Sequence, residues 1–283
     1  MKKPSFNFLL VALLLGVWSG CDTSDQKPKT DKNNSANVAQ VSLKKPVSQD
    51  TIKVQTIKVD SSISLDYLVG KFIPSKHEAF TLIERKYASR NGMYMRKEAY
   101  ADFKRMHAAA VADGIQLVVK SATRPFNAQK TIWEGKWTGK RLVEGGQNIA
   151  KTIPDPKQRA LKILEYSSMP GTSRHHWGTD IDLNNFTNEY FAKGKGLKEY
   201  EWLIKNAPKF GFCQTYTEKG PKRPYGYNEE KWHWSYLPIA KKLTEQYKLR
   251  LNDQAIDGFL GAETAVDIQV VKKYVLGINE QCL

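Results

Sequence analysis

The sequence predicts an α+β domain in which helices surround a small, mainly antiparallel β-sheet. Segments with apolar residues at helical spacing alternate with short runs rich in β-branched and aromatic residues, a mixture typical of helices packed on a few strands. The chain has 283 residues, of which 41% are hydrophobic, so it can bury one good core or two small ones. The sequence shows no internal repeat that would indicate a repetitive architecture.

The expected helices are inferred from the spacing of apolar residues. The helix at 96–112 is rich in alanine and ends before Asp113-Gly114. Further helices are expected at 127–137, 155–166, 198–207 and 238–249. Strands are expected at 115–119, 178–183 and 231–237, where β-branched or aromatic residues gather. The order of these strands in a sheet does not follow from the sequence.

The N-terminal segment predicts export. Lys2 and Lys3 precede a short apolar stretch at 8–17, and small residues stand just before Cys21, as in a bacterial lipoprotein signal. Trp18 departs from that pattern, which usually has an aliphatic residue there, and an ordinary secretory signal is the alternative. Either signal locates the protein outside the cytoplasm, and the first predicts a cell-envelope protein, periplasm-facing or extracellular, held to a membrane by lipid on Cys21.

A polar segment follows Cys21. It is rich in Lys, Asp, Asn, Ser and Gln, and it has too few large apolar side chains to offset its chain entropy. We therefore expect a signal peptide at 1–20, a lipid-anchored flexible linker at 21–62 and a folded domain at 63–283.

The cysteine count predicts a disulfide, and the net charge indicates which kinds of partner to expect. With Cys21 lipidated, Cys213 and Cys282 remain as a pair in an oxidising compartment, and we predict a disulfide between them; two separate buried thiols are the alternative. Removing residues 1–20 lowers the formal charge from +15 to +13, which attracts anionic partners in general. The basic residues form no cluster with a nucleic-acid motif, so no nucleic-acid partner is expected.

Three of the five histidines fall in two short aromatic segments, 173–182 and 230–234. On a strand, side chains two residues apart share a face, so Asp182 and Asp180 would point the same way. A turn at Gly178 would bring His175 beside Asp182. His175, Asp182 and His233 would then form the two-histidine, one-carboxylate ligand set of a hydrolytic zinc site, with Glu230 as the general base. The alternative is that these are scattered polar residues satisfied by hydrogen bonds.

The two segments resemble the zinc-peptidase family that contains VanY-type D-alanyl-D-alanine carboxypeptidases and the VanX dipeptidase. The family motif Ser-x-His-x-x-Gly-x-Ala-x-Asp, followed by Glu-x-x-His, is matched by Ser173, His175, Gly178, Asp182, Glu230 and His233. Asp180 departs from it, because the strict pattern has Ala there, and it is expected either to add charge near the metal or to accept a hydrogen bond from a ligand histidine. The family also has an upstream Arg followed five residues later by Gln, matched by Arg124 and Gln129.

The resemblance implies roles for these residues. His175, Asp182 and His233 would hold one Zn2+ per chain, in a cleft on the sheet of a hedgehog/DD-peptidase-like fold. Glu230 and Arg124 would be catalytic, with Arg124 beside the oxygen that becomes negative. Ser173 and Gln129 would contact the substrate, although a turn residue and a helix-face residue are the alternatives.

The implied function is a monomeric zinc-dependent D,D-carboxypeptidase that removes the terminal D-alanine from peptidoglycan stem peptides. A peptidoglycan endopeptidase or an L,D-carboxypeptidase would use the same chemistry. A non-catalytic cell-wall-binding lipoprotein is the rival from another class, and a catalytic base such as Glu230 argues against it. A serine hydrolase built on Ser173 lacks the expected nucleophile-elbow motif.

Overall fold

The computed structural model describes residues 58–283. The expected signal peptide at 1–20, Cys21 and most of the linker at 21–62 lie outside the described residues. Residues 58–62, which the sequence assigned to the linker, contact helix α7 (Leu237–Arg250). The side chain of Gln246 on this helix donates to the carbonyl oxygen of Lys58 and accepts from the amide of Asp60. The ordered domain therefore includes these residues.

A four-stranded antiparallel sheet lies at the centre of this domain. Its strand order is β3-β4-β6-β5, and each neighbouring pair is antiparallel. A second, two-stranded antiparallel sheet pairs β1 with β2. The bounds of the strands are β1 Phe80–Leu82, β2 Tyr94–Arg96, β3 Val119–Ser121, β4 Asp180–Leu183, β5 Phe212–Gln214 and β6 His233–Tyr236.

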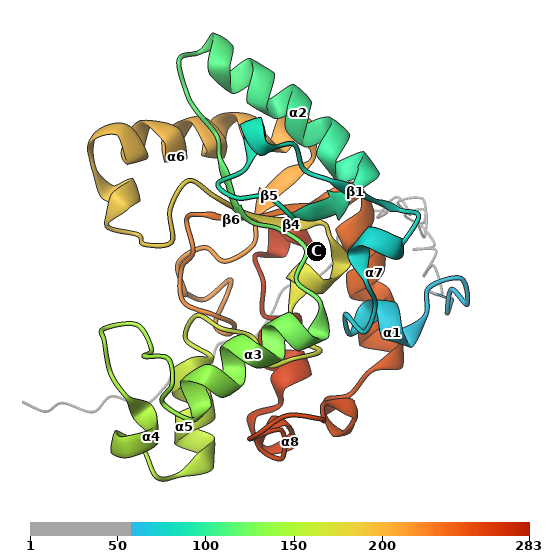
Figure 1. The fold of residues 1–283 in the computed structure, drawn as a ribbon, viewed down its shortest axis with the longest axis vertical. Helices are drawn as coiled ribbons and strands as arrows, with labels where there is room; N and C mark the ends of the chain where they lie inside the picture. Colours follow the sequence, from blue (N-terminus) through green and yellow to red (C-terminus); the bar gives the residue numbers. More distant parts are fainter. Residues whose placement is uncertain (1–57) are drawn as a thin grey trace, which may run out of the picture. The chain divides into compact units, whose positions relative to one another are not determined.

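The helices lie around this sheet (Figure 1), which confirms the predicted α+β class. Figure 1 shows α2 and α6 on one side of the sheet and α3 on the other. The bounds of the helices are α1 Leu65–Leu68, α2 Lys97–Ala112, α3 Phe126–Trp137, α4 Ile149–Thr152, α5 Pro156–Ile163, α6 Gly194–Asn206, α7 Leu237–Arg250 and α8 Thr264–Ile268. Five of these are the helices expected from apolar spacing, with ends shifted by a few residues.

Strands β4 and β6 give the sheet two unlike faces because side chains alternate along a strand. Ile181 and Leu183 of β4 and Trp234 and Tyr236 of β6 are buried in one apolar cluster. This cluster also includes the buried apolar side chains of α2 and α6. The alternate residues of the two strands are polar and face the opposite side, where the site described below is found.

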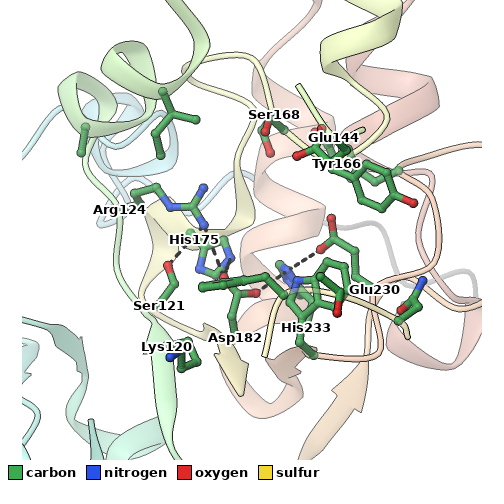
Figure 2. A pocket seen from close by; sticks show the side chains of 18 of the residues that line it. Lys120, Ser121, Arg124, Glu144, Tyr166, Ser168, His175, Asp182, Glu230 and His233 are labelled. Atoms are coloured by element: carbon green, nitrogen blue, oxygen red, sulfur yellow. Dashed lines mark hydrogen bonds and ion pairs between the residues drawn. The ribbon is translucent and has the colours of Figure 1, made fainter. Parts of the chain in front are cut away.

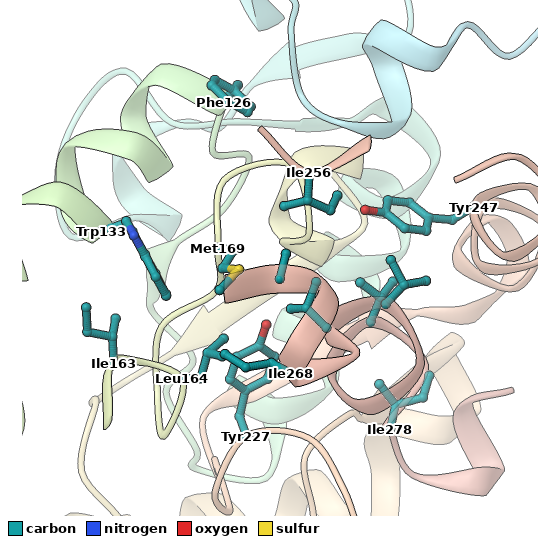
Figure 3. Packing of buried hydrophobic residues seen from close by; sticks show 14 of the residues in the cluster. Phe126, Trp133, Ile163, Leu164, Met169, Tyr227, Tyr247, Ile256, Ile268 and Ile278 are labelled. Carbon is teal, nitrogen blue, oxygen red and sulfur yellow. The ribbon is translucent and has the colours of Figure 1, made fainter. Parts of the chain in front are cut away.

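A second apolar cluster packs α3, α5, α7 and α8 together (Figure 3). Trp133 of α3 is fully buried, and its indole N–H donates to the carbonyl of Leu260 in the C-terminal segment. The predicted disulfide between Cys213 and Cys282 is confirmed and ties the end of the chain to β5. The C-terminal segment is therefore part of the domain core.

One strand is displaced from its predicted position. The sequence predicts a strand at 115–119, but β3 begins only at Val119. The backbone N–H of Val118 donates to the side-chain oxygen of Asn184, and the backbone N–H of Asn184 donates to the carbonyl oxygen of Val118. These two hydrogen bonds take the place of strand pairing at Val118. Across residues 58–283, no helix combines the length and apolar character needed to cross a bilayer.

Candidate metal centre

The register of β4 against β6 groups four polar side chains on one face of the sheet. Asp182 lies opposite His233, and Asp180 lies opposite Ser235. All four residues are buried, and the exposed fraction of each is 3% or less. Because residues opposite or diagonal across two strands have Cβ atoms within reach of each other, His233 lies between both aspartates.

His175 reaches this face from a short 3-10 helix, Arg174–Trp177. The helix ends at Gly178, whose left-handed backbone (φ of +74°) turns the chain into β4; an added Cβ there would also clash with the ring of Phe80. The Nδ1 atom of His175 is 3.0 Å from the carbonyl oxygen of Ala122, so it carries the hydrogen and donates it. Its Nε2 atom is left facing Asp182, 3.3 Å from Oδ2.

His175, Asp182 and His233 thus meet in one cluster (Figure 2). One ligand atom from each lies within 4.8 Å of the others. Asp182 Oδ1 is buried, has no hydrogen-bond partner among residues 58–283, and lies 3.3 Å from His233 Nδ1. A buried carboxylate with one imidazole nitrogen beside each oxygen, and with one oxygen lacking a hydrogen-bond partner, fits a cation. Two histidines with one carboxylate are the donors of hydrolytic zinc sites.

The charges around the cluster favour a cation as well. Burial by itself raises the pKa of Asp182, but the two histidines beside it outweigh burial and hold the pKa well below its usual range. Burial lowers the pKa of His233, yet the neighbouring carboxylates of Asp180, Asp182 and Glu230 together raise that pKa well above its ordinary value. Three carboxylates around one imidazole therefore stabilise positive charge at this point.

Glu230 lies on the wall of the same site, 5% exposed, with Oε2 3.2 Å from His233 Nδ1. Burial raises the pKa of the Glu230 carboxyl above its ordinary value. A carboxylate with a raised pKa accepts a proton more effectively near neutral pH. Glu230, His175, Asp182 and His233 all line an open pocket of about 720 Å³.

Arg124 lines this pocket too, and the structure holds its guanidinium in place (Figure 2). Nη1 donates to Gln129 Oε1 at 2.8 Å, and Nη2 donates to Ser121 Oγ at 3.3 Å. Nη2 is also 3.6 Å from Asp182 Oδ2. A register shift in β3 after Val119 brings Ser121 opposite Asp182, as expected of a β-bulge that re-aims a side chain. Arg124 is therefore a fixed cation beside the cluster.

Gln129 and Ser173, the two residues expected to contact substrate, are both buried and are not among the residues that line the pocket. Gln129 is fully buried and does not line the pocket; it bridges Arg124 to the carbonyl oxygen of Ser168, which its amide reaches at 2.7 Å. Ser173 is 1% exposed and is also absent from the pocket wall, and its hydroxyl has no partner within the described part of the chain. Gln129 thus holds Arg124, which corresponds to the helix-face alternative.

Asp180 acts as an acceptor for His233, one of the two roles expected for it. Its Oδ2 atom is 2.9 Å from His233 Nε2 and 3.2 Å from Arg174 Nε. Burial raises the pKa of Asp180, but Arg174 and His233 outweigh it, so the pKa lies well below its ordinary value. Arg174 was missed in the sequence, because nothing in its local pattern distinguishes a buried arginine from an exposed one.

The pocket wall also includes aromatic residues. Tyr166 and Trp232 stack with ring centroids 6.4 Å apart, and Phe186 packs edge-on against Trp232. The second histidine of the first segment, His176, is fully buried and bridges the carbonyl of Arg124 and the amide of Gly171. It supports the site without facing it.

The site therefore has the arrangement of a hydrolytic metal centre: a buried histidine–aspartate–histidine cluster, a neighbouring glutamate and a fixed arginine, all in one pocket. The family model described as VanY, D-alanyl-D-alanine carboxypeptidase, matches residues 92–239, more than half of the chain. The protein belongs to this family. The matched range contains the residues of the site itself: Arg124, His175, Asp182, Glu230 and His233.

The chain is also similar to individual proteins and to solved structures. An uncharacterised protein of Haemophilus influenzae is 30% identical over 122 residues, which are 37% of this chain and 90% of that protein. A D-alanyl-D-alanine carboxypeptidase of Enterococcus faecalis is 29% identical over 143 residues, 49% of this chain and 47% of that protein. A solved structure of the VanY D,D-pentapeptidase from a VanB-type resistance cassette, in complex with Zn(II), is 24% identical, with a TM-score of 0.44 over 68% of this chain and 92% of that chain.

Proposed function

We propose that the protein is a zinc-dependent D,D-carboxypeptidase that removes the terminal D-alanine from peptidoglycan stem peptides. The observation that carries the proposal is the convergence of His175, Asp182 and His233 on one point, with Glu230 beside them in an open pocket. Membership of the VanY family supports the peptidase class and the D-alanyl-D-alanine substrate.

The roles of the side chains follow from their positions. A zinc ion held by His175, Asp182 and His233 would activate a water molecule and polarise the scissile carbonyl. Glu230, whose carboxylate lies 3.2 Å from His233, accepts the proton of the attacking water and passes it to the leaving amine. Arg124 stabilises the negative charge that grows on the carbonyl oxygen, an effect commonly worth about 3–4 kcal/mol of barrier.

The pocket supports a substrate larger than two residues. The pocket has a volume of about 720 Å³, and its wall includes Tyr166, Trp232 and Phe186 in addition to the histidine–aspartate–histidine cluster. Aromatic side chains at such a rim would pack against the preceding part of a stem peptide. An endopeptidase would use the same wall, so the products of the reaction decide between the two activities.

The location of the enzyme is part of the proposal. A signal at 1–20, lipid on Cys21 and a polar linker would hold a monomeric domain at the outer side of a membrane, facing the cell wall. A stem-peptide hydrolase acts in that compartment, and a disulfide between Cys213 and Cys282 fits its oxidising conditions.

The test is digestion of defined muropeptides followed by mass measurement of the fragments. Loss of one D-alanine from a pentapeptide stem is the expected result. Two peptide fragments from a cross-linked substrate, with no free D-alanine, would assign an endopeptidase. Intact stems after incubation with zinc-loaded protein would favour a non-catalytic wall-binding lipoprotein.

A further inference from the structure

We propose that Asp180, held by Arg174, is a positioning residue that fixes the ring of His233 so that this histidine binds the metal through Nδ1. The inference rests on the metal site proposed above. It concerns a position where the strict family motif has Ala, a residue without a side-chain acceptor. The carboxylate is therefore an addition to the motif.

The contacts of Asp180 leave it no freedom to turn. Its side chain is fully buried, and each oxygen accepts two hydrogen bonds. Oδ2 accepts from His233 Nε2 at 2.9 Å and from Arg174 Nε at 3.2 Å. Oδ1 accepts from Thr179 Oγ1 at 2.8 Å and from Ser235 Oγ at 2.7 Å. A buried carboxylate that is fully bonded in this way has one orientation.

Arg174 is fixed in the same network. Its guanidinium has no exposed surface and donates to Thr244 Oγ1 of α7 at 2.8 Å and to Ser235 Oγ of β6 at 2.9 Å, besides its bond to Asp180. It also lies over the ring of Trp177, 4.6 Å from the centroid. Because the two charges compensate each other, the sheet can hold a carboxylate behind a metal ligand without an uncompensated buried charge.

The consequence is a difference between the two ligand histidines. His175 donates its Nδ1 hydrogen to a neutral carbonyl, that of Ala122, and offers Nε2 to the site. His233 donates its Nε2 hydrogen to a carboxylate and offers Nδ1, which lies near Asp182 and Glu230. A carboxylate acceptor fixes the tautomer and raises the basicity of the opposite nitrogen more than a carbonyl does. His233 is thus the more strongly oriented of the two ligands.

The first test measures zinc affinity by competition with a chromophoric chelator. Asp180→Asn removes the charge at nearly the same volume, and we expect it to weaken zinc binding about 10–100-fold, the usual effect of losing such a partner. The matched control is Thr179→Val, which removes a hydrogen bond to the other oxygen of the same buried carboxylate but leaves its bonds to His233 and Arg174. This variant is expected to bind zinc as the wild type does.

The second test uses the wild-type protein, so it stands even if Asp180→Asn does not fold. Nitrogen-15 NMR of the zinc-loaded protein, which has five histidines, reports which ring nitrogen carries hydrogen. We expect the hydrogen on Nε2 in His233 and on Nδ1 in His175. Hydrogen on Nδ1 of His233, or equal zinc affinity in Asp180→Asn and wild type, would overturn the inference while leaving the peptidase proposal intact. Failure of the wild type to take up zinc would instead refute the proposed function.

Discussion

Gln129 offers a direct test of how Arg124 is held. We predict that Gln129→Leu lowers kcat and leaves KM nearly unchanged, because Gln129 contacts Arg124 and lies outside the pocket wall. A substrate-contacting glutamine would instead raise KM when removed. The two outcomes distinguish the positioning role that the structure indicates from the substrate role that the sequence suggested.

The expected fall in kcat follows from the contacts that hold the Arg124 guanidinium. The bond from Arg124 Nη1 to Gln129 is the shortest side-chain contact of the guanidinium, at 2.8 Å, while those to Ser121 and Asp182 are 3.3 and 3.6 Å. A hydrogen bond to a charged group contributes about 1.5–3 kcal/mol. At about 1.4 kcal/mol per factor of ten, kcat should fall roughly 10- to 100-fold.

The matched control is Gln246→Leu. Gln246 is also buried, and its side chain also makes two hydrogen bonds, both of them to backbone groups, but it lies on α7, away from the pocket wall. Both variants should lose about 1–3 kcal/mol of unfolding free energy, measured by urea denaturation, because each removes the two side-chain hydrogen bonds of a buried glutamine. Steady-state kinetics on a pentapeptide stem should then separate them. A Gln129→Leu enzyme with normal kcat and a raised KM would refute the reasoning.

Two further changes test other parts of the account. Glu230→Gln should keep zinc and lower kcat by about 10²–10⁴-fold, since it removes the proton acceptor; retained turnover would remove Glu230 from that role. Replacing Cys213 and Cys282 by Ser should lower the unfolding free energy by about 4 kcal/mol in the chain-entropy model, because the disulfide closes a loop across 69 positions. Zinc affinity should not change in this variant, and an equal urea midpoint would show that the C-terminal segment needs no disulfide.

Part of the cluster could be predicted from local sequence. His175 and Asp182 meet because strand alternation and the turn at Gly178 are local properties, readable from a few residues. His233 was added as the second histidine of a zinc ligand set and through the resemblance to the family motif, because the pairing of β6 with β4 does not follow from the sequence. The helix at 97–112 was equally clear from its apolar spacing. The turn at Gly178 and this helix depend on short stretches of chain, so both could be predicted without knowledge of the tertiary fold.

The supporting residues depend on contacts between distant segments and were not predictable in the same way. Arg174 is bonded to Thr244, 70 positions later in the chain, and no local pattern marks it as buried. Gln129 was recognised from its spacing to Arg124, but its burial depends on α3 packing against the segment around Ser168. The strand expected at 115–119 begins later because Asn184, from the end of β4, bonds to Val118.

The central claim is that His175, Asp182 and His233 share one ion on which release of D-alanine depends. Metal analysis of the purified protein, paired with an assay of free D-alanine before and after chelation, tests it most directly. We predict one zinc per chain, loss of release on chelation and recovery when zinc is returned, with His233→Ala losing both metal and activity. Undiminished release of D-alanine from metal-free protein would contradict the account.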